Sequence, residues 1–206
     1  MDAFEIQVYD GTALHAHGVG IELHSNAVAR GQTHFTLEPA VGVFSWWEMG
    51  AYFQTAFTPD GTFRYAGTKL RSKFVAPAWR GFRVGLNTEF SILPERFDPE
   101  RWGVELRPIV AFENERAMIA LNPNLDVGKS GASFQPSATA LLKIQRKAAI
   151  GVEYYASFEE REQHYLFPVV NVLAFPHVEI NLGFGAGLSP KSERFIAKMI
   201  LGYALD

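Results

Sequence analysis

Hydrophobic and polar side chains alternate along most of this chain with a period of two. From Phe82 to Ile92, one face reads Phe, Val, Leu, Thr, Phe, Ile and the other reads Arg, Gly, Asn, Glu, Ser. The same alternation runs from Trp47 to Phe57 and recurs over 150–157 and 178–185. Because successive side chains of a β-strand point to opposite sides, each segment predicts a strand with one apolar face and one face of polar residues and glycine.

This pattern predicts an all-β fold, a single antiparallel up-and-down transmembrane β-barrel. The twelve expected strands lie at 18–30, 33–44, 46–58, 62–76, 80–93, 101–113, 116–128, 133–145, 148–158, 162–175, 177–188 and 193–206. Residues 4–10 are a candidate for an extra N-terminal strand. We assign residues 1–17 to an N-terminal segment, which lies in the periplasm or caps the pore, and residues 18–206 to the barrel.

The connections between the expected strands alternate in length. The short ones lie at 44–46, 77–80, 114–116, 146–148 and 175–177, and the longer polar ones at 58–62, 93–102, 127–133, 158–163 and 188–194. The connection at 30–33 is short and breaks the rule. Tight turns at one end and longer loops at the other are typical of outer-membrane barrels.

Composition helps to decide which face meets the core. The chain has 206 residues, of which 48% are hydrophobic and 17 are Phe. Twelve strands with an apolar face could hardly all be buried in so short a chain without covering helices. The polar face also carries glycines, which suit the crowded inside of a barrel better than a strand facing water: Gly20, Gly42, Gly50, Gly67, Gly85, Gly103, Gly151, Gly183, Gly185 and Gly202. The apolar face is therefore predicted to contact lipid.

Several classes of protein are excluded. No run of 18 apolar residues is present, so a transmembrane helix is not expected. The absence of cysteine removes disulfide scaffolds, thiol nucleophiles and cysteine zinc sites. A net charge of −3 gives no basic excess, so we expect no nucleic-acid partner. No signal peptide follows Met1. We expect a mature chain that lies in the bacterial outer membrane, although a cytosolic location would also fit this N-terminus.

The polar face predicts a charged lumen. The first three barrel strands contribute acids, and the next two contribute bases. If the lumen is open, these sectors create a transverse field that orients polar solutes; if it is narrow, the charges pair and close it. We favour a narrow, water-filled pore lined by Glu22, His24, Glu38, Glu48, Lys69, Arg71, Lys73, Arg83, Glu89, Glu105, Arg107, Asp126, Lys143, Glu153, Glu179 and Lys198.

Two resemblances support the barrel. The final segment, FIAKMILGYALD, resembles the C-terminal strand of bacterial outer-membrane proteins, although it ends in Leu205-Asp206 where an aromatic residue is common. The stretches LEPAVGVFSWWEMGAYFQ and FRYAGTKLRSKF resemble the outer-membrane porin family associated with the meta-pathway of phenol degradation. The resemblance implies a small Gram-negative barrel and carries over no catalytic or binding residue.

Candidate catalytic and metal-binding motifs are weak. A lipid-hydrolysing serine site needs Ser and His on one face, but His24 and Ser25 are adjacent and must point to opposite sides of a strand. His15 and His17 have the i, i+2 spacing of two metal ligands without an evident third. We therefore predict no catalytic residue, no metal and no cofactor.

The sequence thus favours a narrow pore for small polar or amphipathic solutes, with outer-membrane lipid and an unidentified small solute as its partners. Two alternatives remain. One is a lipid-modifying barrel enzyme of the phospholipase or lipid A deacylase type. The other is a soluble lipocalin-like β-barrel binder, which requires the apolar face to point inward.

Overall fold

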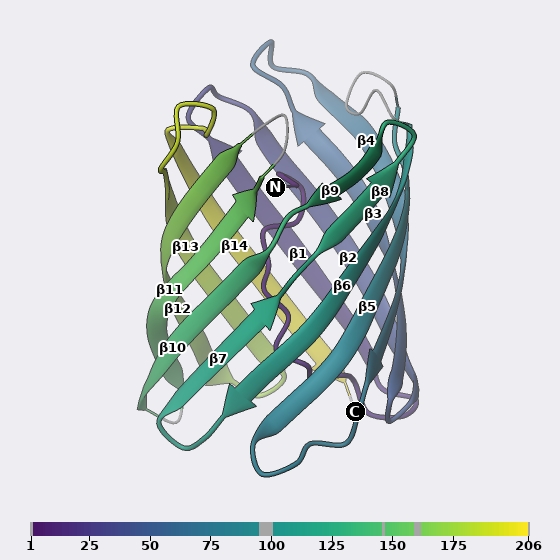
Figure 1. The fold of residues 1–206 in the computed structure, drawn as a ribbon, viewed down its shortest axis with the longest axis vertical. Helices are drawn as coiled ribbons and strands as arrows, with labels where there is room; N and C mark the ends of the chain where they lie inside the picture. Colours follow the sequence, from purple (N-terminus) through teal and green to yellow (C-terminus); the bar gives the residue numbers. More distant parts are fainter. Residues whose placement is uncertain (1, 95–100, 146, 159–161, 206) are drawn as a thin grey trace.

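The computed structural model describes residues 2–94, 101–145, 147–158 and 162–205, and the chain forms a closed antiparallel barrel (Figure 1). Strands that follow one another along the wall pair antiparallel, and β1 pairs with β14 over Val19–Val28, which closes the wall. The strands are β1 (Val19–Val28), β2 (Thr33–Phe44), β3 (Trp47–Phe57), β4 (Phe63–Val75), β5 (Phe82–Ile92), β6 (Trp102–Glu113), β7 (Ala117–Asn122), β8 (Leu125–Gly128), β9 (Gly131–Phe134), β10 (Ser137–Gln145), β11 (Ala148–Ser157), β12 (Gln163–Phe175), β13 (Val178–Gly187) and β14 (Phe195–Leu205).

These fourteen segments make a barrel of twelve strands, as predicted. β7 and β8 are one strand interrupted at Pro123, and β9 and β10 are one strand interrupted at Pro136. β6 pairs with both β7 and β8, so the wall continues across the first interruption. Proline has no backbone N–H to give to the ladder, so each of these two positions lacks one ladder donor.

The two ends of the barrel differ in the way the sequence predicted. Short turns such as 176–177 join strands at the lower end in Figure 1, where the C-terminus also lies, and longer connections such as 188–194 lie at the upper end. The expected loops at 93–102 and 158–163 fall partly outside the described residues. We call the two ends the short-turn end and the long-loop end.

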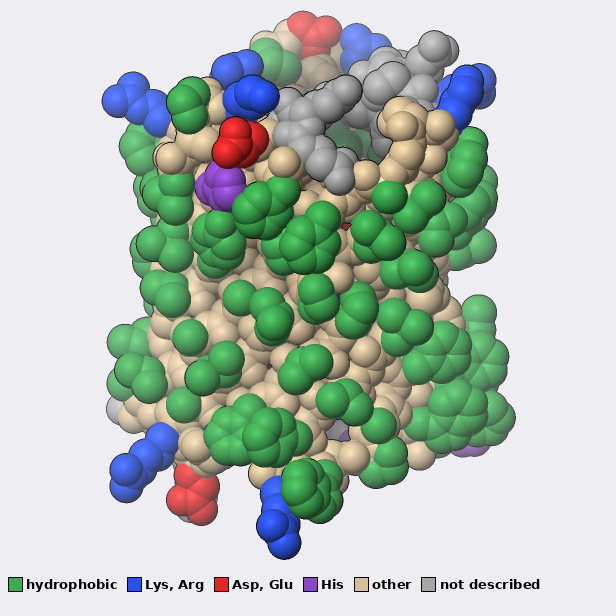
Figure 2. Space-filling view, in the orientation of Figure 1, with side chains coloured by type: hydrophobic (Ala, Val, Ile, Leu, Met, Phe, Trp, Pro, Cys, Tyr) green, Lys and Arg blue, Asp and Glu red, His purple; other side chains and the backbone are tan. Residues whose placement is uncertain are grey.

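The outside of the barrel is apolar (Figure 2). Charged side chains on the face shown gather near the top and bottom, and hydrophobic side chains cover the middle. The outward positions of every part of the wall carry exposed large apolar residues, among them Ile21, Leu37, Phe53, Leu86, Val110, Val152, Leu182 and Leu201. Such an exterior suits lipid. It contradicts the lipocalin-like alternative, which needs these side chains inside.

Aromatic side chains stack at both ends of the wall. At the short-turn end, the rings of Phe44 and Trp46 lie 5.5 Å apart and those of Trp47 and Phe74 lie 6.1 Å apart. At the long-loop end, Phe184 and Phe195 stack at 5.5 Å. These positions match the interfacial girdles of membrane barrels. The described residues contain no helix long and apolar enough to cross a membrane.

The N-terminal segment (residues 2–17) runs through the inside of the barrel (Figure 1, purple). The prediction of a strand at residues 4–10 is wrong, because these residues pair with no neighbouring strand. Their alternation reflects contacts with the lumen wall instead. The wall makes room for the segment at Gly42, where a Cβ atom would lie only 2.0 Å from the carbonyl oxygen of His15.

A charge placed on the outer face should test the orientation of the wall. Leu37 lies near the middle of β2 with 41% of its surface exposed, whereas Val19 lies at the end of β1 with 48% exposed. We expect Leu37→Arg to lower the free energy of unfolding in lipid vesicles by about 2–4 kcal/mol and Val19→Arg by about 0–1 kcal/mol. Equal losses, measured by denaturant titration, would contradict a lipid-facing middle band.

Candidate functional site

The sixteen charged or titratable side chains predicted to line the pore differ in exposure. Ten are buried: His24, Glu38, Glu48, Lys69, Arg71, Lys73, Glu89, Arg107, Glu153 and Lys198. Glu22, Arg83, Glu105, Asp126 and Lys143 are half-buried, and Glu179 is exposed. Glu179 nevertheless borders a cavity together with Glu22 and Lys198. Most of the predicted pore-lining side chains are therefore shielded from bulk water inside the barrel.

The acidic and basic sectors meet rather than face each other across open space. Arg71 Nη2 lies 2.6 Å from Glu38 Oε1 and 2.5 Å from Glu48 Oε1. Lys73 Nζ lies 3.0 Å from the same oxygen of Glu48. These residues come from the adjacent strands β2, β3 and β4. The charges that the sequence placed in separate sectors are thus paired, which is the arrangement expected for a narrow interior.

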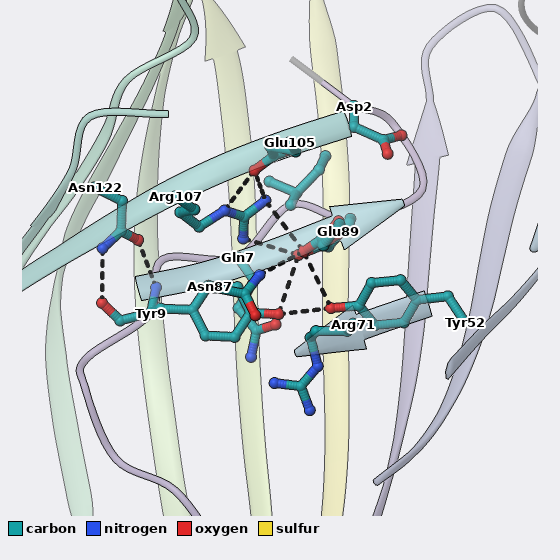
Figure 3. A network of polar contacts seen from close by, with 12 residues as sticks. Asp2, Gln7, Tyr9, Tyr52, Arg71, Asn87, Glu89, Glu105, Arg107 and Asn122 are labelled. Atoms are coloured by element: carbon teal, nitrogen blue, oxygen red, sulfur yellow. Dashed lines mark hydrogen bonds and ion pairs between the residues drawn. The ribbon is translucent and has the colours of Figure 1, made fainter. Parts of the chain in front are cut away.

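A second cluster joins β4, β5 and β6 to the N-terminal segment (Figure 3). Arg107 Nη1 lies 2.8 Å from Glu5 Oε1, and Arg107 Nη2 lies 2.6 Å from Glu105 Oε1. Lys69 Nζ lies 3.1 Å from Glu89 and 2.7 Å from Asp2. Buried charges are stable only when they are paired. Within the wall, Lys69 and Arg107 already have Glu89 and Glu105 as partners, and Asp2 and Glu5 add further ion pairs that join the segment to the wall.

A third cluster lies on the opposite wall. Lys198 of β14 pairs with Glu153 of β11 and also donates to the carbonyl oxygen of Ile6 at 3.0 Å. The Nδ2 atom of Asn181 donates to the other oxygen of Glu153 at 3.2 Å. One cation therefore binds the wall and the backbone of the N-terminal segment together.

Polar side chains of the wall satisfy the backbone of the N-terminal segment. Asn122 accepts from the N–H of Tyr9 at 2.7 Å and donates to the carbonyl oxygen of the same residue at 3.0 Å. Thr36 donates to the carbonyl oxygen of Phe4 at 2.8 Å, and Glu48 accepts from the N–H of Leu14 at 2.8 Å. Buried backbone groups must be paired, and here side chains take the place of a neighbouring strand.

Two apolar side chains anchor the segment. Ile6 is fully buried against a cluster formed by Leu141, Tyr155, Tyr165, Phe167, Val169 and Ile196. Phe4 packs on Ala56 and Ala66 and contacts the ring of His34 edge-on at 4.7 Å. The wall residues that surround Ile6 point inward from the strand face that the sequence identified as polar. The alternation alone could not reveal these contacts, because it shows on which face of a strand a residue lies and not which residues that face meets.

The phenol ring of Tyr9 lies among the bases of the lumen. The guanidinium carbon of Arg107 lies 4.7 Å from the ring centroid, and Lys73 Nζ lies 5.5 Å away. The hydroxyl groups of Tyr9 and Tyr52 are 2.7 Å apart. The face of an aromatic ring attracts cations electrostatically, so these contacts help to bind the segment to the lumen wall.

The segment leaves part of the interior empty. A cavity of about 140 Å³ lies beside it and is bordered by wall residues of both charges, including Glu38, Arg71, Glu179 and Lys198. A smaller space of about 20 Å³ is bordered by Asp2, Glu105 and Arg107. The larger cavity is roomy enough to hold several water molecules.

The rejected motifs lie apart from one another. His24 is fully buried and faces the lumen, and Ser25 follows it on the opposite face of β1. His15 and His17 are at the end of the N-terminal segment, outside the strands.

The residues of the site that the sequence did not predict include Asp2, Glu5 and Tyr9. The sequence did contain one signal for their role: residues 2–17 include three acidic residues and no Lys or Arg, which suits a segment that binds among basic side chains.

The fold is similar to those of solved outer-membrane channels. A channel from Pseudomonas putida F1 has a TM-score of 0.68 and 11% identity, and the match covers 98% of this chain and 100% of that one. The KdgM porin, solved in complex with disordered oligogalacturonate, gives 0.65 and 9% over 91% and 99%. The NanC porin gives 0.59 and 7% over 91% and 99%. No protein-family model and no curated protein matches the chain. The chain therefore has the fold of twelve-stranded outer-membrane barrels.

Removal of one segment carboxylate should loosen the segment. Glu5→Gln removes the ion pairs that join the segment to Arg107 and Lys69 through Glu5, and leaves these bases with Glu105, Glu89 and Asp2 as partners. We expect faster hydrogen exchange in a peptide covering residues 2–14, because the Tyr9 N–H loses its stable contact with Asn122. Glu115→Gln, in an exposed turn, is the matched control. Unchanged exchange in Glu5→Gln would show that this ion cluster does not hold the segment.

Proposed function

We propose that this chain is an outer-membrane channel for small polar or amphipathic solutes and that the N-terminal segment closes its lumen in the conformation described above. The observation that carries the proposal is the combination of an apolar exterior with an interior that buries ten of the sixteen charged or titratable side chains predicted to line the pore. Outer-membrane lipid is the partner we propose for the exterior.

The width of the barrel supports a channel. Side chains can fill a barrel of eight strands, whereas sixteen strands leave an aqueous passage, and twelve strands lie between these cases. Here a separate stretch of chain occupies the space that wall side chains leave. The segment is bound to the lumen wall largely by hydrogen bonds and ion pairs, and water can replace these contacts if the segment withdraws.

Withdrawal of the segment would also change the charge of the lumen. Lys69, Arg107 and Arg83 would each lose a carboxylate partner, because Asp2, Glu5 and Asp10 belong to the segment. The exposed bases would then favour solutes that carry carboxylate or hydroxyl groups. The proposal includes membership of the porin family that the sequence resembles, although that resemblance specifies no solute.

We propose that passage occurs by diffusion, without a chemical step or a cofactor. Neither alternative function gains support from a specific contact. A lipid-modifying site would require a Ser near a His on one face, and the adjacent pair His24-Ser25 is divided between the lumen and the outer face.

Single-channel recording tests the proposal directly. We expect the refolded full chain to show low or intermittent conductance in planar bilayers. A chain lacking residues 2–14 should show larger, steadier conductance, because the lumen loses its internal occupant. This variant keeps His15 and all residues after it, so the start of β1 at Val19 is unchanged. Absence of conductance in both proteins, each shown to be folded by a heat-modifiable gel shift, would reject the channel.

A further inference from the structure

Three of the lumen side chains form a compact group to which the proposed channel gives no individual role. Glu22 and His24 lie on the inward face of β1, and Glu38 lies opposite them on β2, where Glu22 and Glu38 are directly paired in register. His24 Nε2 is 3.4 Å from Glu22 Oε2 and 3.5 Å from Glu38 Oε2. One ring nitrogen therefore faces two carboxylate oxygens at almost equal distances.

The histidine of this group has unmet bonding capacity. His24 is fully buried, and neither of its ring nitrogens has a hydrogen-bond partner among the described residues. The Oε2 atom of Glu38 is also buried without such a partner among those residues. Buried polar atoms without partners are uncommon and call for a specific explanation. A single N–H could be directed at only one of the two carboxylates.

Other contacts orient the two carboxylates toward the histidine. Arg71 Nη2 occupies Glu38 Oε1 at 2.6 Å, which leaves Oε2 free to face His24. Gln7 of the N-terminal segment donates to Glu22 Oε2 at 3.2 Å. The Gln7 hydrogen bond is made to the same Glu22 oxygen that faces His24, and the Arg71 contact is made to the other oxygen of Glu38. Ligating carboxylates in protein metal sites are commonly hydrogen-bonded in this way.

The spacing of the three ligand atoms fits a bound ion. All three atoms lie within 4.8 Å of one another. A tetrahedral ion with bonds of about 2.1 Å holds its ligands about 3.4 Å apart, which is close to both histidine–carboxylate distances. Glu22 and Glu38 also border the cavity of about 140 Å³, which provides room for a water ligand and a route for an ion.

The negative charge of the two carboxylates is only partly balanced by neighbouring Lys and Arg side chains. Glu22 has no Lys or Arg within ion-pair distance in the part of the chain that the structure describes, and its nearest cationic candidate is His24 itself. Glu38 shares Arg71 with Glu48. From this charge balance and the ligand geometry, we propose that Glu22, His24 and Glu38 form a binding site for a first-row divalent transition-metal ion of the Zn²⁺ class.

The donor set determines which ion should bind. One imidazole nitrogen and two carboxylate oxygens suit Zn²⁺, Cu²⁺ and Ni²⁺, whereas Ca²⁺ and Mg²⁺ prefer sites built wholly from oxygen. A bound ion would link β1 to β2 and, through Gln7 and Glu22, would also steady the N-terminal segment. The site is thus distinct from His15 and His17, which lie at the end of that segment.

Calorimetry with Zn²⁺ alone tests the proposal. We expect the refolded, tag-free full chain in detergent to bind one Zn²⁺ at this site, with no comparable binding of Mg²⁺ or Ca²⁺. His24→Gln should weaken that binding by about 100-fold or more, because loss of a direct ligand should exceed the 10–100-fold effect of losing a supporting contact. Glu38→Gln should also weaken it.

Two controls separate this site from others. His34→Gln removes another buried lumen histidine outside the group, and the double variant His15→Gln/His17→Gln removes the pair in the N-terminal segment. Both should retain Zn²⁺ binding. Loss of binding in the double variant, or equal binding by wild type and His24→Gln, would overturn the proposal, as would no binding by folded wild type.

A spectroscopic measurement keeps the test independent of variant stability. The electron paramagnetic resonance spectrum of the wild-type chain loaded with one Cu²⁺ should show coupling to a single imidazole nitrogen. The spectrum should be unchanged in the His15→Gln/His17→Gln variant. Coupling to two nitrogens, or to none, in wild type would reject the proposed ligand set.

Discussion

The rest of this structure depends on one constraint, which is that backbone N–H and C=O groups in lipid must all be paired within the protein. The pairing of β1 with β14 meets this constraint by removing both sheet edges. Closure explains why the chain alternates with a period of two, because each residue of a closed wall faces either lipid or lumen. It also explains why the proline interruptions at 123 and 136 are tolerated together: β8 pairs with β9 beyond them, so the wall remains continuous.

Closure creates a second problem inside the barrel. The inward faces bring many charges into a small space, and each buried charge is unfavourable unless it is paired. The wall pairs Arg71 with Glu38 and Glu48 by itself. Around Lys69 and Arg107, the N-terminal segment adds the carboxylates of Asp2 and Glu5. The same stretch of chain therefore fills volume and adds ion pairs to bases of the wall, to which its three acids and its lack of Lys and Arg are suited.

The sequence was sufficient for the wall because alternation is a local consequence of strand geometry. It placed Glu48 and Tyr52 on one face of β3 and Phe53 on the other without knowledge of any partner. It was insufficient for residues 4–10, which alternate in the same manner but have no free edge to join once twelve strands have closed. The contact of Tyr9 with Asn122 joins positions far apart in the chain, and no local pattern encodes it. For the same reason, the sequence suggested opposed charged sectors, whereas strand register determined that they pair.

The docking of the N-terminal segment depends on its attachment to the wall. The segment leads directly into β1, so its association with the lumen is intramolecular and avoids the loss of translational freedom that a separate peptide would suffer. Ordering the segment still restricts many backbone dihedrals, and the buried side chains of Phe4, Ile6 and Tyr9 provide apolar burial against that loss. Its ion pairs gain little beyond the desolvation of their own charges. A balance of this kind favours a segment that is held firmly enough to fill the lumen and weakly enough to exchange with water or solute.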